Sequence, residues 1–142
     1  MVSDLAGHLR HLVDFRYLSV SLHDGSRNVM RVHILETSEP AVRQFPSEIP
    51  MEGSIAGWVW QHQQPFVRRD VQQETRFSTT MLVRDVPVKS VCVLPLTTTH
   101  QWLGVLSFAS DKTGANDQLD LEFAQLVAAE IAVAVENALS LS

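Results

Sequence analysis

The chain contains a single cysteine, Cys92, in the apolar stretch SVCVLPL at residues 90–96. A lone thiol can react as a thiolate, bind a metal ion, or fill space as a small apolar side chain. One cysteine excludes an internal disulfide and the paired spacing of structural zinc sites. Strand alternation places Cys92 on one face with Ser90, Leu94 and Leu96, and that face borders either a cavity or the core. Because buried free cysteines behave as small apolar residues, we favour the structural interpretation.

Histidine and carboxylate side chains offer further metal-binding chemistry. His33, Asp85 and Asp111 could approach the cysteine in a folded domain and form a site of thiolate, imidazole and carboxylate. His8 and His11 have an i, i+3 spacing on a predicted helix that can hold a metal ion, but no third ligand lies nearby in the sequence. We therefore predict no metal site and no cofactor, and interpret the i, i+3 pair as solvent-exposed.

Catalytic and phosphate-binding motifs are absent from the sequence. It has no G-x-S-x-G elbow, no H-E-x-x-H helix and no glycine-rich phosphate loop, so we predict a domain that is not an enzyme. Arg76 could pair with a carboxylate ligand, although we favour an ion pair with Asp70 or Glu74. Trp58 could close the roof of a pocket, although core packing is favoured. The candidate ligand-binding residues are Trp58, Arg76, Phe77, Ser90, Cys92 and His33.

Length and composition predict one soluble domain. The 142 residues are 45% apolar and 19% charged, and this length can bury one core. A net charge of −5 without a run of Lys or Arg argues against direct nucleic-acid binding. We expect no tract that is long and apolar enough to span a bilayer, and the first residues lack the order of a secretory signal. We therefore predict a cytoplasmic domain, residues 1–142, with no membrane partner.

Hydrophobic patterning predicts the elements that position these residues. Helical spacing predicts an amphipathic helix over about residues 3–14, a short helix capped by Ser54, and a long helix over about residues 117–140 capped by Asn116 or Asp117. Residues 37–51 contain three prolines and are predicted as a loop. Alternation and turn formers predict four main strands, at residues 17–23, 29–36, 88–98 and 102–110.

The order of these elements predicts an α+β sandwich. The strands would form a central antiparallel sheet, with the N-terminal and C-terminal helices on one face. Small helices and loops would form a pocket lid on the other face, so that sheet and lid together occupy about residues 16–110.

The C-terminal helix has an unusually wide apolar arc, which one sheet contact does not need. We expect a first stripe, with Phe123, Val127 and Ile131, to face the sheet. A second stripe, rich in alanine, would let another helix approach closely; the alternative is coverage by the N-terminal helix. We predict a homodimer whose interface contains Leu121, Ala128, Ala132, Val135, Leu139, Leu5 and Leu9.

Three stretches resemble GAF domains: GWVWQHQQPFVRRDVQQETRF, KSVCVLPLTTTHQWLGVLSFAS and LEFAQLVAAEIAVAVENAL. The resemblance covers nearly the whole chain and is greatest to the N-terminal sensory GAF domain of formate-hydrogenlyase-activator-like, sigma-54-dependent transcriptional regulators. It implies an often dimeric module that binds a small molecule between sheet and lid. It also implies a signal passed through the terminal helices to an effector domain, which we expect after Ser142 because the sequence has no P-loop, kinase or cyclase motif.

Several GAF functions depend on residues that this sequence lacks. Bilin-binding relatives carry a cysteine followed by a histidine, whereas valine and leucine follow Cys92 here. Relatives that reduce free methionine sulfoxide need a second thiol, which is absent. The Asn-Lys pair of cyclic-nucleotide-binding relatives is replaced by Asp111-Lys112, and Phe77 is followed by Ser-Thr-Thr-Met.

The combined prediction is a non-catalytic sensory and regulatory GAF domain. It would bind an unidentified small molecule and relay a signal to the effector domain of a transcriptional regulator or signalling kinase. Two alternatives stay open. One is a purely structural dimerisation domain whose pocket is filled by Trp58, Phe77, Met81 and Phe108, and the other is a thiol or metal redox sensor at Cys92.

Overall fold

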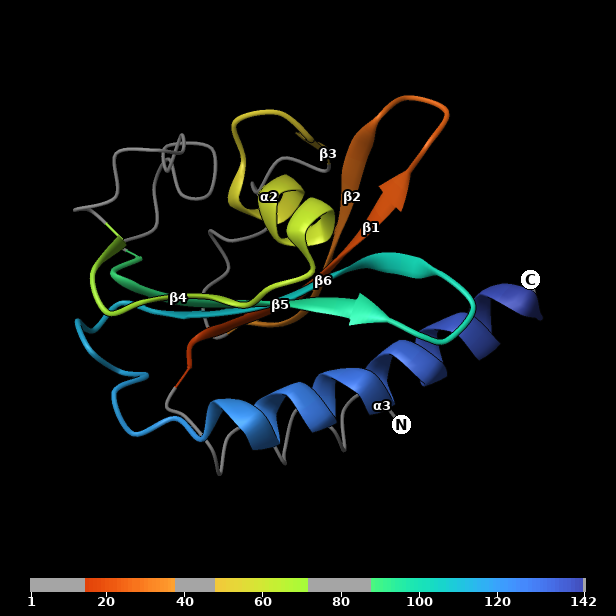
Figure 1. Cartoon of the computed structure of the whole chain (residues 1–142). Coiled ribbons are helices and arrows are strands. Elements are labelled where there is room, and N and C mark those ends of the chain that lie inside the picture. Colours follow the sequence, from red (N-terminus) through yellow and green to blue (C-terminus); the bar gives the residue numbers. More distant parts are fainter. Residues whose placement is uncertain (1–14, 38–47, 72–87, 142) are drawn as a thin grey trace.

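A central antiparallel sheet separates one short helix from one long helix (Figure 1). A computed structural model of the chain describes residues 15–37, 48–71 and 88–141. Within them, α2 (Ile55–His62) covers one face of the sheet and α3 (Leu121–Ser140) covers the other. The predicted N-terminal helix lies outside the described residues, as do most of the proline-containing loop and the segment with Phe77 and Met81.

The sheet has six strands in the order β3-β2-β1-β6-β5-β4, and every neighbouring pair is antiparallel. The two predicted hairpins form its centre, and two three-residue strands complete its edges. The strands are β1 (Tyr17–Asp24), β2 (Val29–Thr37), β3 (Glu48–Pro50), β4 (Phe66–Arg68), β5 (Ser90–Thr97) and β6 (Trp102–Ser110). The predicted α+β architecture is therefore confirmed.

Alternation along the central strands creates two separate hydrophobic cores. On the α3 face, Leu18, Leu94 and Leu106 are buried with residues of α3, and this group is the α3-side core. On the α2 face, Val91 and Val105 are buried with residues of α2, and this group is the α2-side core. Burial of apolar surface on both faces explains why the central strands carry few charged residues.

Capping residues set where the two helices begin. Ser54 caps α2 as predicted, because its Oγ accepts a hydrogen bond of 3.0 Å from the Gly57 amide. The predicted cap of α3 was wrong. Asp120 is the N-cap, and its carboxylate accepts a hydrogen bond of 3.1 Å from the Phe123 amide. Asn116 is instead buried, and its amide donates to the backbone carbonyls of Arg68 and Val91, which ties the preceding loop to the sheet.

The predicted orientation of α3 requires a correction. Ala128 and Ala132, assigned to a partner interface, are 1% and 0% exposed and belong to the α3-side core. Of the stripe assigned to the sheet, Val127 and Ile131 are buried in this core as predicted, whereas Phe123 is 47% exposed. The small side chains of the alanines allow the helix to approach its own sheet closely, so the alanine stripe is used within the chain.

α3 also meets the length and composition criteria for a membrane span, with a hydropathy of 1.3 in an 18-residue window. The expectation that no tract is long and apolar enough was therefore wrong on that criterion. A core helix of a soluble domain passes the same test, and one face of α3 packs in the α3-side core.

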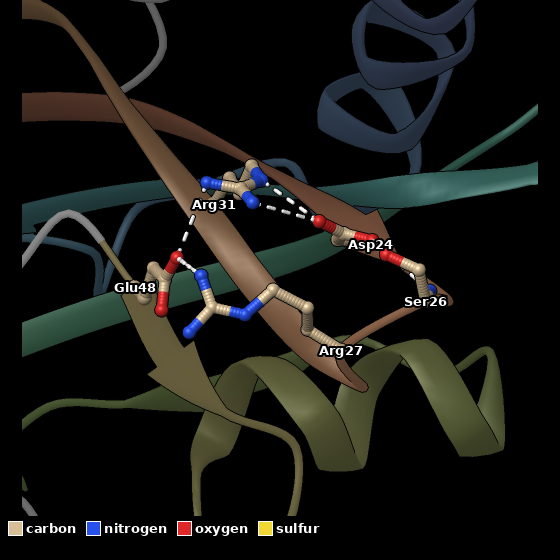
Figure 2. Close-up of polar contacts among 5 residues, drawn as sticks. All are labelled: Asp24, Ser26, Arg27, Arg31 and Glu48. Atoms are coloured by element: carbon tan, nitrogen blue, oxygen red, sulfur yellow. Dashed lines mark hydrogen bonds and ion pairs between the residues drawn. The ribbon is translucent and has the colours of Figure 1, made fainter.

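An ion-pair network joins the β1–β2 turn to β3 (Figure 2). Asp24 accepts hydrogen bonds from the Ser26 hydroxyl at 2.6 Å and the Arg31 Nε at 2.9 Å. Arg31 also contacts Glu48 at 3.2 Å, and Glu48 accepts a second bond of 2.5 Å from Arg27. The Ser26 hydrogen bond, followed by the one from Arg31, lowers the pKa of Asp24 to about 2.

We expect Asp24→Asn to lower the free energy of unfolding at pH 7, because asparagine keeps the turn but loses the charge beside Arg31. A lowered carboxyl pKa stabilises the fold above the unfolded pKa of ~3.9, and that stabilisation is lost as the pH falls toward the folded value. The difference from the wild type should therefore shrink between about pH 4 and pH 2 in urea unfolding curves.

Glu52→Gln, at an exposed carboxylate, serves as the control. A difference between Asp24→Asn and the wild type that stays constant from pH 7 to pH 3 would contradict this account.

Candidate functional site

The α2 face of the sheet carries short polar side chains at its centre. Ser19 of β1 lies directly opposite Ser107 of β6, and Ser107 lies opposite Val93 of β5. Both serines are half-buried, although they occupy the two central strands. In the adjacent row, Tyr17 lies opposite Ala109. The centre of this face therefore presents hydroxyl groups and small side chains.

The opposite face of the same strands is filled by large apolar side chains. Leu18, Leu106 and Phe108 are 1%, 0% and 2% exposed on the α3 face. Because alternate residues of a strand point to opposite faces, the serines are separated from this core by their own backbone. Ser19, Ser107 and Ala109 are smaller than the leucine and phenylalanine side chains of the opposite face, so we take the α2 face as the candidate binding face. We define Tyr17, Ser19, Ser107 and Ala109 as the floor of the candidate site.

Aromatic and cationic side chains flank the floor on the side of β4. Phe66 is buried opposite Val93, and the Arg68 guanidinium lies 4.1 Å from the centre of the Phe66 ring. Trp58 of α2 meets Phe66 edge-to-face at 6.1 Å and stacks on His62 at 4.5 Å. A cation held against an aromatic ring, on the same face of the sheet as the floor, is suited to a small polar or anionic molecule.

Close packing fixes α2 over this face. A Cβ atom on Gly57 would lie 1.9 Å from the backbone oxygen of Met51, so only glycine permits this approach. The Ser54 hydroxyl also donates to the Pro50 carbonyl at 2.7 Å. Helix α2 is therefore tied to the segment that follows β3.

Cys92 and Ser90 lie on the α3 face and do not reach the floor. Cys92 is 0% exposed in the α3-side core, and burial raises its pKa to about 12. Ser90 is 2% exposed and lies opposite Ser110. Both side chains lie on the face that α3 covers, which fits the structural interpretation favoured for Cys92 and separates the two residues from the floor. Alternation along a strand predicts which residues share a face but not which layer covers that face.

The other predicted residues are divided. His33 is exposed and lies opposite Val20, on the α3 face, so it is away from the floor. Trp58 is half-buried and packs against the α2-side core, in keeping with the core packing that was favoured for it. Arg76 and Phe77 lie outside the described residues, as do Leu5 and Leu9 of the predicted interface.

Metal-binding geometry is absent from the part of the chain that the structure describes. No group of three or more His, Cys, Asp or Glu side chains there could hold an ion. Asp111, one predicted ligand, forms an ion pair with Arg16. Asp85, His8 and His11 lie outside the described ranges.

Sequence reasoning missed the serines and the tyrosine of the floor. The signal was present in YLSVSLHD and WLGVLSFAS, where small polar residues alternate with large apolar ones on central strands. Such alternation usually marks a solvent-facing surface, and here it coincides with the face that carries α2.

The family model described as "GAF domain" matches residues 2–135. The formate hydrogenlyase transcriptional activator of Salmonella typhimurium is 23% identical over 99% of this chain, and the chain spans about a fifth (21%) of that protein. Among solved structures, the GAF domain of a Bacillus halodurans two-component sensor histidine kinase has a TM-score of 0.73 at 22% identity, with 96% of this chain and 92% of that chain covered.

A free methionine-R-sulfoxide reductase from Neisseria meningitidis, solved in complex with its substrate, has a TM-score of 0.69 at 18% identity. The alignment covers 89% of this chain and 72% of the reductase chain. At these identities the solved structures show the fold alone, and the same architecture therefore occurs in both a sensor kinase and an enzyme.

We expect the Cys92 thiol to be nearly inert while the domain is folded. Its burial blocks access, and a pKa of about 12 removes almost all thiolate at pH 8. The rate with an aromatic disulfide reagent should be at least ~100-fold lower in native protein than in urea-denatured protein. Comparable rates in the two states would show a reachable thiol and restore the redox-sensor interpretation.

Proposed function

The chain belongs to the GAF domain family, and from this premise we propose that it is a non-catalytic sensory and regulatory module. It binds a small molecule against the α2 face of its sheet and relays the binding event through its terminal helices. In the longer protein, the receiver is the effector domain of a transcriptional regulator or signalling kinase, and the location is cytoplasmic. The regulatory context of the Salmonella activator and the Bacillus kinase supports this proposal.

The observation that carries the proposal is the floor of the candidate site. Ser19 and Ser107 are half-buried hydroxyls on the two central strands, whose opposite face buries Leu18, Leu106 and Phe108. A surface used only for packing would favour large apolar side chains at these positions, since each buried methylene stabilises a fold by about 0.8 kcal/mol. Retained hydroxyls are better explained by a polar ligand that they bind.

The structural alternative is a pocket filled by Trp58, Phe77, Met81 and Phe108, and one of these four residues does not fit it. Phe108 lies in the α3-side core, so it cannot fill a pocket on the α2 face. The reductase alternative lacks a thiol at the site, because the chain's single cysteine is buried on the α3 face. Both observations favour ligand binding without catalysis.

We further propose that α3 pairs with α3 of a second copy. Its exposed large apolar residues are Phe123 at 47%, Leu126 at 62%, Val133 at 51% and Leu139 at 48%. Exposed apolar side chains gathered on one helix favour association. The sequence of α3 contains no Lys or Arg, which disfavours an anionic lipid surface as the partner. Of the residues predicted for the interface, Leu139 is exposed, whereas Leu121 and Val135 are partly buried against the α3-side core and the two alanines belong to it.

Ligand binding is tested by native mass spectrometry of the purified chain, together with a thermal-shift screen of small carboxylates, amino acids and nucleotides. We expect a co-purifying mass or an upward shift in Tm, since a ligand at 100 times its Kd stabilises the native state by about 2.7 kcal/mol. Ser107→Leu should abolish the signal because the larger side chain occupies the floor. Thr113→Leu, at an exposed loop position, should leave it unchanged.

A wild type that carries no extra mass and responds to no compound in the panel would support the structural alternative. A shift that survives Ser107→Leu would place the ligand elsewhere.

Dimerisation is tested by sedimentation velocity. We expect a dimeric wild type and a monomeric Leu126→Glu variant, because the substitution buries an unpaired carboxylate at the proposed contact. Gln125→Glu adds the same charge to an exposed position on another side of α3 and should remain dimeric. A monomeric wild type, or two variants that behave alike, would contradict the proposed interface.

A further inference from the structure

The tip of the β5–β6 hairpin, residues 97–102, contacts both helical layers of the domain. Consecutive residues of an extended chain point to opposite faces, so neighbouring residues of the tip can contact different helical layers. Thr97 contacts the end of α2, whereas Thr98 contacts α3. The pairing register of β5 with β6 shifts between Leu96 and Thr97, so the tip lies beyond the regular ladder.

The α2 contact is a chain of hydrogen bonds around Gln63. The Thr97 hydroxyl donates to the Gln63 Oε1 at 2.5 Å, and the Gln63 Nε2 donates to the Trp60 carbonyl at 2.7 Å. The Trp60 indole in turn donates to the Trp102 carbonyl at 3.2 Å, with the two rings edge-to-face at 5.5 Å. Both ends of the hairpin tip are therefore bonded to α2.

The backbone of Gln63 is strained. Its φ of 54° and ψ of 41° lie in the left-handed region, which residues other than glycine adopt at a cost. The side chain is held from both sides in this conformation, by Thr97 and by its own helix. The C-terminal end of α2 therefore depends on the hairpin for its geometry.

The α3 contact centres on the Glu136 carboxylate, whose side chain is 19% exposed. Thr98 donates to its Oε2 at 2.6 Å and Gln101 donates to the same atom at 3.3 Å. The His100 Nδ1 lies 3.1 Å from the Oε1. Hydrogen bonding, first from Thr98, lowers the pKa of Glu136, so the carboxylate is ionised at neutral pH and holds three residues of the tip.

We propose that the β5–β6 hairpin tip is the mechanical link that couples the C-terminal end of α2 to the last turns of α3. A displacement of α2 moves the tip through Gln63 and Trp60, and this changes the hydrogen bonds between the tip and Glu136. The sheet keeps the two helices on opposite faces, and this tip reaches both of them beyond the regular strand ladder. The link deepens the proposed sensory function, because it would carry a change on the ligand-binding face to the output helix.

Amide hydrogen exchange tests the link in the ligand-free protein. Thr97→Val removes one hydroxyl that contacts α2 and leaves Glu136 and its donors intact. We expect exchange at residues 133–140 of α3 to accelerate at least about threefold, while residues 124–131 keep the wild-type rate. Thr99→Val is the matched control, since Thr99 is exposed at the same tip, and it should change neither segment.

A second pair of variants tests the route. Gln63→Gly tolerates the left-handed backbone and removes the side chain, so it should reproduce the effect of Thr97→Val. A Glu136→Ala variant has already lost the contact between the hairpin tip and α3. In that background, Thr97→Val should add no further acceleration of amide exchange at residues 133–140.

Unchanged exchange at residues 133–140 in Thr97→Val, alongside faster exchange in α2, would overturn the link. So would an acceleration spread evenly over all of α3, which would indicate global destabilisation. Either failure leaves the proposed sensory function intact, because no ligand takes part in the experiment.

Discussion

The two faces of the central strands differ in side-chain volume, and the remainder of the architecture depends on that difference. Leucine and phenylalanine side chains on one face require a long apolar helix, and α3 supplies it with alanines that permit close contact. Ser19, Ser107 and Ala109 on the other face are small, and two of them carry hydroxyl groups. One strand pair thus builds both a dense core and a polar floor, because consecutive residues of a strand point in opposite directions.

The fold could be predicted from the sequence because its elements are short-range patterns. The turn formers of residues 24–28, the Ser54 cap and the apolar alternation of the central strands each act within a few residues. The assignment of faces to layers could not be predicted in the same way. Nothing in SVCVLPL says whether Cys92 points to α2 or α3, and nothing in the wide apolar arc of α3 says that its alanine stripe meets the sheet. Those choices depend on contacts between residues far apart in the chain.

The candidate site was predicted only in part for the same reason. Trp58 packs against the α2-side core, on the face that carries the floor, whereas Ser90, Cys92 and His33 lie on the α3 face of the sheet. A small residue on a strand has the same local signature in a core and in a pocket. The shared fold of a sensor kinase domain and a reductase makes the same point at a larger scale, since their chemistry depends on a few side chains that a common backbone positions differently.

Within the described residues, the two edge strands of the sheet are three residues long, and their composition has a consequence for how copies of the domain can meet. β3 begins with the charged Glu48 and ends with Pro50, which has no amide hydrogen to donate, and β4 ends with Arg68. Short edges with charge and proline resist the addition of a strand from another molecule. Contact between these sheet edges, the route that leads to open-ended fibrils, is therefore disfavoured, which accords with the closed, symmetric pairing through α3 that we propose.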